Sequence, residues 1–141
     1  TVSHKLKKRN EKKNMELKYQ NEISSIKNCP LENQKGEKKL YRCVENPMDI
    51  NSFKPNAVLL KPKFKNNCLA WGLSLFNNYD SAKQMLNNLS KKKRNNYSEI
   101  AQSKLSDEDG IKHSSKNKNH YTFYPTKSLD ILSKFVIVNE K

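Results

Sequence analysis

Residues 66–78 read NNCLAWGLSLFNN, an apolar run that lies between two asparagine pairs. A short run without charged residues, bounded by polar residues, is typical of a strand that is covered on both faces. Strand alternation divides its side chains into two sets: Trp71, Leu73 and Leu75 on one face, and Ala70, Ser74 and Phe76 on the other. We therefore expect a core strand here, with either a bulge or a site where Gly72 and Ser74 interrupt it.

Other strand patterns lie on both sides of this run. KKLYRCVEN (38–46) alternates, so that Leu40, Arg42 and Val44 share one face. AVLLKPKF (57–64) contains Pro62, which predicts an edge strand or an extended loop. Three later strands are predicted at YSEIAQSKL (97–105), HYTFYP (120–125) and KFVIV (134–138). Asp109-Gly110 followed by IKHS predicts a hairpin after the first of these three.

Two helices are expected. The first covers about residues 12–27, where apolar residues recur at helical spacing, and it ends before Cys29-Pro30. Its stripe consists of Met15, Tyr19, Ile23 and Ile26. The second covers about residues 80–90, where Ser81 and Gln84 match the capping box.

These elements predict an α+β fold. We expect a mostly antiparallel sheet of five to seven short strands, one N-terminal helix and one well-capped helix. The predicted organisation is a basic segment and helix over residues 1–28, a polar linker over 29–38, and an α+β domain over 39–141.

Positive charge is the strongest compositional feature. Lys and Arg number 28 against 14 Asp and Glu, which gives a formal net charge of +14. Such an excess indicates attraction to a polyanion, although a lysine-rich coding bias would give the same count. Two basic clusters stand out, and they define the predicted nucleic-acid-binding residues: Lys7, Lys8 and Arg9, then Lys91, Lys92, Lys93, Arg94 and Tyr97. Lysine acts as a point charge, so the expected binding is loose and dominated by phosphates.

Three classes of function follow. The first is a small basic protein that binds nucleic acid, RNA in particular, as a toxin-like effector whose aromatic HYTFYP segment stacks on unpaired bases. A ribonuclease of this kind would use His120 as acid or base. The second is an enzyme of the kind implied by the family resemblance given at the end of this section, and the third is an interaction module that binds an acidic partner protein through the N-terminal helix.

Several classes of chemistry have no support in the sequence. Phosphate-binding glycine loops, zinc-protease motifs and nucleophile elbows are absent. The three cysteines, Cys29, Cys43 and Cys68, form no C-x-x-C pair, so we expect no metal and interpret them as reduced thiols of a cytoplasmic protein. No apolar run reaches the roughly 20 residues of a membrane span.

Three polar residues on predicted strands are the catalytic candidates. Arg42 breaks a core strand, so it either points to solvent or holds a ligand or ion pair. Ser74 follows Gly72, where a missing side chain admits a close neighbour or a ligand. His120 shares a face with Thr122 and Tyr124, and this face is either a plain polar surface or a phosphate-binding and proton-relay site.

The layout LYR…GLS.F….A…….I….L…DG……HY, over about residues 39–125, resembles a set of small bacterial proteins and, more remotely, the ADP-ribosyltransferase fold. The residues alone indicate no cofactor, whereas the resemblance implies NAD as the cofactor. It implies Arg42 at the cofactor's phosphate or ribose and Ser74 at its nicotinamide side. The sequence departs from the family at the catalytic glutamate, for which only Glu99 and Glu140 lie near late strands, and neither has the expected context.

Overall fold

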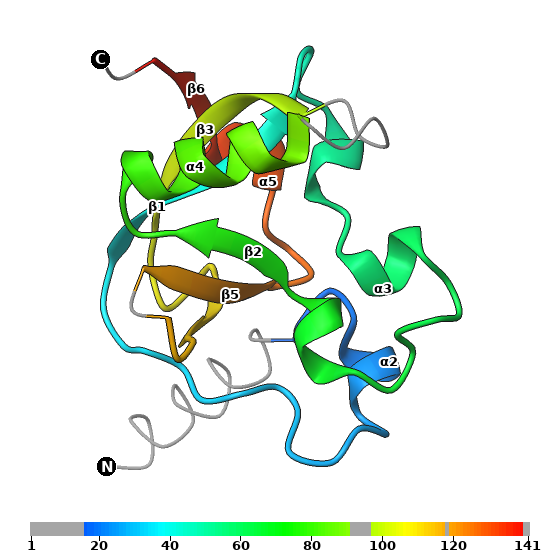
Figure 1. Ribbon diagram of the computed structural model, residues 1–141. Coiled ribbons are helices and arrows are strands. Elements are labelled where there is room, and N and C mark those ends of the chain that lie inside the picture. Colours follow the sequence, from blue (N-terminus) through cyan, green and yellow to red (C-terminus); the bar gives the residue numbers. More distant parts are fainter. Residues whose placement is uncertain (1–15, 91–96, 118, 140–141) are drawn as a thin grey trace, which may run out of the picture.

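The chain folds around one antiparallel sheet of six strands (Figure 1). The computed structural model describes residues 16–90, 97–117 and 119–139. The strands are β1 (Lys38–Glu45), β2 (Leu73–Phe76), β3 (Tyr97–Leu105), β4 (Gly110–Ser114), β5 (His120–Pro125) and β6 (Val136–Val138), in the order β4-β5-β2-β1-β3-β6. The predicted α+β class is therefore confirmed, and β1 and β2, both predicted as core strands, lie at its centre.

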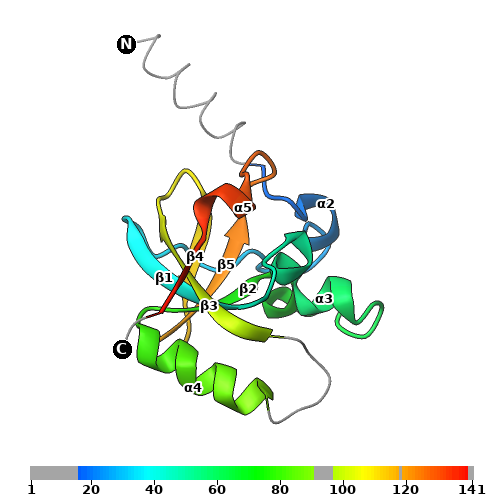
Figure 2. The ribbon, with the colours of Figure 1, turned by 90° about the horizontal axis from the view of Figure 1, so that it is seen from above.

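Short helices surround the sheet. They are α2 (Gln20–Ile23), η1 (Ile50–Phe53), α3 (Asn56–Leu59), η2 (Cys68–Trp71), α4 (Tyr79–Ser90) and α5 (Ile131–Lys134). Figure 2 shows α4 and α5 on opposite sides of the sheet. The helix predicted over about residues 80–90 is confirmed as α4, but its cap differs from the prediction: the Asn78 side chain accepts a hydrogen bond from the Ser81 amide at 2.8 Å.

The side chains of β1 alternate between the two faces of the sheet and pack into two separate cores. Leu40 and Val44 are fully buried in one core, together with Phe53 of η1 and Phe135 after α5. Tyr41 and Cys43 point to the other face, where α4 contributes Ala82 and Leu86. The two sets are the odd and even residues of one strand, as its sequence pattern predicts.

A third core lies beside the end of β5 and corrects the N-terminal prediction. Of the described part of residues 12–27, only Gln20–Ile23 is α-helical, and Leu17 instead forms a bridge with Thr126. Ile23 is buried in this core, and the Tyr19 ring lies 5.5 Å from that of Trp71. The apolar stripe thus packs inside the chain, and its first member, Met15, lies outside the described residues.

Two further predictions are wrong for identifiable reasons. The run 57–64 is not extended: Pro55 precedes α3, and proline suits the start of a helix because its φ angle is already helical. Asp109-Gly110 makes no hairpin between β3 and β4, since β3 pairs with β1 and β6, while β4 pairs with β5. Gly110 is needed because a Cβ there would collide with the Tyr124 carbonyl of β5, and its φ is +151°.

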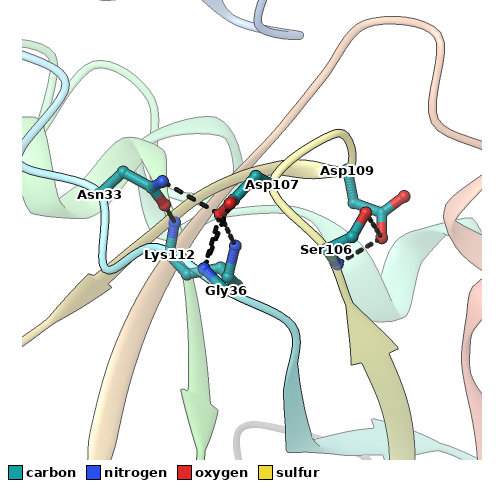
Figure 3. A network of polar contacts seen from close by, with 6 residues as sticks. All are labelled: Asn33, Gly36, Ser106, Asp107, Asp109 and Lys112. Atoms are coloured by element: carbon teal, nitrogen blue, oxygen red, sulfur yellow. Dashed lines mark hydrogen bonds and ion pairs between the residues drawn. The ribbon is translucent and has the colours of Figure 1, made fainter.

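Polar contacts fasten segment 29–38, predicted as a linker, to the turn before β4 (Figure 3). The Asp107 carboxylate accepts hydrogen bonds from the Gly36 amide at 3.1 Å and from the Asn33 side chain at 3.2 Å. It also forms an ion pair of 2.9 Å with Lys112, whose side chain is fully buried. The Asn33 side chain in turn accepts from the Lys112 amide. A lysine in the strand GIKHS thus lies inside the fold.

A disulfide joins Cys29 to Cys68, so the expectation of reduced thiols is wrong for this pair; Cys43 is free and buried. The prediction of a cytoplasmic location rested on reduced thiols, and the disulfide gives that prediction no support. Within the described parts of the chain, no helix has the length and apolar character needed to cross a membrane.

Candidate functional site

Arg42 is buried at the centre of the sheet, on β1. The residue is 7% exposed. The guanidinium donates two hydrogen bonds to backbone carbonyls, from Nε to Ser52 at 2.9 Å and from Nη1 to Ser74 at 3.0 Å. It also lies 5.9 Å from the centre of the Phe53 ring. Backbone carbonyls and an aromatic ring therefore hold this cation in place.

The charge of Arg42 has no carboxylate partner among the described residues, whose two ion pairs involve other side chains. Burial lowers the pKa of Arg42, because removal from water disfavours the charged form. The residue lines a cavity of about 270 Å³, with Lys54 and Tyr97 also on its wall. A buried cation at a cavity wall is suited to an anionic ligand that completes its charge balance.

Pairing of β2 with β5 brings Ser74 to His120. Ser74 pairs directly with Thr122, and His120 pairs with Phe76. His120 Nε2 lies 3.1 Å from Ser74 Oγ, and the His120 ring lies edge-on to the Phe76 ring at 5.4 Å. Gly72 permits this close packing, since a Cβ there would collide with the Thr122 side chain. The three catalytic candidates of the sequence, Arg42, Ser74 and His120, thus lie on adjacent strands and meet at Ser74.

A second cavity adjoins the first. Its volume is about 350 Å³, and Asn56 and Ser74 line both cavities. Its remaining wall consists of Phe64, Asn67, Leu69, Ala70, Ser115, His120 and Thr122. Small-molecule sites generally measure about 300–1,000 Å³, so the two cavities together have the size of a ligand site.

Ser115 belongs to this site, although sequence reasoning did not select it. Its Oγ lies 3.0 Å from His120 Nδ1 and donates to the His120 carbonyl at 2.9 Å. It precedes the turn that joins β4 to β5, and Ser114 pairs with Tyr121. A hairpin drawn between IKHS and HYTFYP would have placed Ser115 opposite His120, so the signal was present in the sequence.

The other predicted residues divide between this site and the parts not described. Tyr97 lines the cavity of Arg42. The basic residues predicted to bind nucleic acid lie outside the described residues: Lys7, Lys8, Arg9, Lys91, Lys92, Lys93 and Arg94. Glu99, on β3, pairs with Val44 of β1 and lines neither cavity. Glu140, like these basic residues, lies outside the described residues.

The polar contacts of this site join a guanidinium, two serine hydroxyls and an imidazole, and the walls also carry Lys54, Thr122 and Tyr97. Burial lowers the pKa of the His120 imidazole, because removal from water disfavours its charged form. Across the described ranges, no group of three or more His, Cys, Asp or Glu side chains is arranged to hold a metal ion. Comparisons with protein-family models, curated proteins and solved structures gave no match. The site itself is therefore the basis for any functional assignment.

Proposed function

We propose that this protein binds NAD in the two adjoining cavities and acts on it as an ADP-ribosyltransferase-like enzyme. The observation that carries the proposal is Arg42, a buried cation without a carboxylate partner among the described residues, on the wall of a cavity. NAD supplies the missing anion, because its two phosphates carry negative charge that a guanidinium binds through paired hydrogen bonds.

The division of the site into two cavities also favours a ligand with two parts. The diphosphate lies at Arg42, with Lys54 nearby. The nicotinamide ribose extends past Ser74 into the cavity of His120. This assignment agrees with the roles that the family resemblance implies for Arg42 and Ser74. It departs from the family at the glutamate, since Glu99 lines neither cavity, and it gives the proton chemistry to His120.

A thermal-shift titration tests this proposal. NAD at a hundred times its dissociation constant stabilises the fold by about 2.7 kcal/mol, which is a readable shift. Arg42, the proposed contact of the diphosphate, is buried and therefore little screened by salt, so we expect the shift to persist at high salt. A nucleotide without the nicotinamide ribose serves as the control and should give a smaller shift. No shift with NAD at either salt concentration would rule out the proposal.

RNA binding is the second candidate, and one observation favours it. Tyr97, the aromatic residue that follows the second basic cluster, lines the cavity of Arg42, where it could stack on a base. The net charge of +14 supports the same ligand. In the same titration, single-stranded RNA would give a shift that disappears at high salt, because log affinity falls by about 0.7 for each phosphate contacted per log unit of salt. Either ligand suits the predicted toxin-like effector.

A further inference from the structure

Ser115 Oγ contacts one ring nitrogen of His120 and two backbone carbonyls. Ser115 Oγ lies 2.9 Å from the His120 carbonyl and 3.3 Å from the Asn117 carbonyl. It also lies 3.0 Å from His120 Nδ1. A serine hydroxyl has a single proton, whereas a carbonyl oxygen only accepts. The His120 carbonyl already accepts from the Ser115 amide at 3.1 Å, but a carbonyl oxygen has two lone pairs and also accepts from Ser115 Oγ at 2.9 Å. In that arrangement the Ser115 oxygen accepts a hydrogen bond from Nδ1–H.

The opposite nitrogen is then a proton acceptor. In a neutral imidazole only one nitrogen carries hydrogen, so Nε2 presents its lone pair to Ser74 Oγ at 3.1 Å. Apart from His120, no residue on the wall of this cavity is titratable in the neutral range, and none is charged. Phe76 packs edge-on against the His120 ring, with 5.4 Å between the ring centres.

We infer that Ser115 is a positioning residue that holds His120 in the Nδ1–H form, so that Nε2 is the general base of this site for a hydroxyl acceptor. The catalytic use of Nε2 rests on the proposed function, whereas the protonation pattern rests on the contacts alone. In that reaction the acceptor oxygen, of water or an alcohol, forms a bond to C1′ of the nicotinamide ribose. The C1′–N bond breaks, its electron pair leaves with nicotinamide, and the acceptor's proton moves to Nε2.

The test is a long-range ¹⁵N–¹H NMR spectrum of the full chain at neutral pH, which distinguishes the two neutral forms of each histidine. His120→Gln identifies the signals of His120. We expect the Nδ1–H form in the wild type, a shift toward Nε2–H in Ser115→Ala, and restoration in Ser115→Thr. His113 is the internal control, because its Nδ1 lies 2.9 Å from the Glu32 carbonyl and should stay Nδ1–H in all variants.

A wild-type His120 in the Nε2–H form would overturn the inference, as would a Ser115→Ala variant that keeps Nδ1–H. If Ser115→Ala fails to fold, the wild-type spectrum still tests the protonation pattern, and Ser115→Thr tests the role of the hydroxyl. Nicotinamide release is measured separately, and we expect Ser115→Ala to lower kcat by about tenfold or more with little change in KM, and Ser115→Thr to restore it. Absence of NAD binding alongside the Nδ1–H form would refute the proposed function and leave the role of Ser115 in place.

Discussion

The ion pair between Lys112 and Asp107 gives the sharpest stability prediction, because its two partners differ in burial. The Lys112 side chain is 0% exposed and that of Asp107 is 48% exposed, with 2.9 Å between Nζ and Oδ1. Asp107→Asn keeps the size of the side chain and removes its charge. The ammonium of Lys112 is then left inside the fold without its carboxylate.

The magnitude follows from that asymmetry. Removing one partner of a fully buried pair costs about 3–5 kcal/mol. Water already solvates about half of Asp107, so part of this cost is absent, and we expect about 2–3 kcal/mol. Lys112→Met removes the buried charge and keeps an unbranched apolar stem of similar length, so its stability should stay close to that of the wild type. The double variant Asp107→Asn/Lys112→Met should then resemble Lys112→Met alone.

Thermal unfolding measures all four proteins. For a chain of this size about 1 kcal/mol corresponds to roughly 3–5 °C, so Asp107→Asn should lower Tm by about 10 °C. The hydrogen bonds and the ion pair lower the pKa of Asp107 to about 2 from 3.8, with Lys112 as the largest cause. This contribution is therefore full above the unfolded pKa of 3.8 and is lost as pH falls toward 2. An unchanged Tm in Asp107→Asn, or additive losses in the double variant, would refute the reasoning.

Three more changes test the fold. Gly72→Ala should cost about 1–3 kcal/mol in urea unfolding, because the new Cβ collides with Thr122; a neutral result would contradict the close approach of β2 and β5. Cys29→Ser with Cys68→Ser should cost about 4 kcal/mol, from the loop entropy of a separation of 39 residues, and should make Tm insensitive to reductant. Asn78→Ala should remove about 1 kcal/mol of helix capping, and equal urea midpoints would count against this cap.

Local sequence patterns predicted correctly those elements whose structure depends mainly on their own residues. The alternation of residues 38–46 predicted β1 and both of its faces, and the helical spacing of residues 80–90 predicted α4. The strand at residues 66–78 was half correct, since Leu73–Phe76 is β2 while Cys68–Trp71 forms η2. Periodicity cannot distinguish a single turn of 3₁₀-helix from the start of a strand when every residue is apolar.

Pairing between distant strands was beyond the same reasoning. A glycine after an aspartate predicts a hairpin locally, but Gly110 serves the approach of β5. No local signal marks Lys112 as buried, because Asn33, which accepts a hydrogen bond from its amide, is 79 residues away in the sequence. Arg42, Ser74 and His120 were selected as exceptions to the strand pattern, and their meeting at Ser74 depends on the order β5-β2-β1, which no local signal specifies.

Isothermal titration calorimetry with NAD is the most direct test of the central claim, that Arg42 binds the anionic part of this ligand. Arg42→Gln removes the charge, and Arg42→Lys keeps the charge but changes the shape of the group. Lys39→Gln is the control. Lys39 is an exposed cation on the same strand and lines neither cavity.

Loss of a buried charge from an ion contact costs at least about 2 kcal/mol, or roughly thirtyfold in affinity. We expect saturable binding to the wild type and to Lys39→Gln, and binding at least about thirtyfold weaker in a folded Arg42→Gln. Equal affinity in Arg42→Gln and Lys39→Gln, or no binding to the wild type, would contradict the claim.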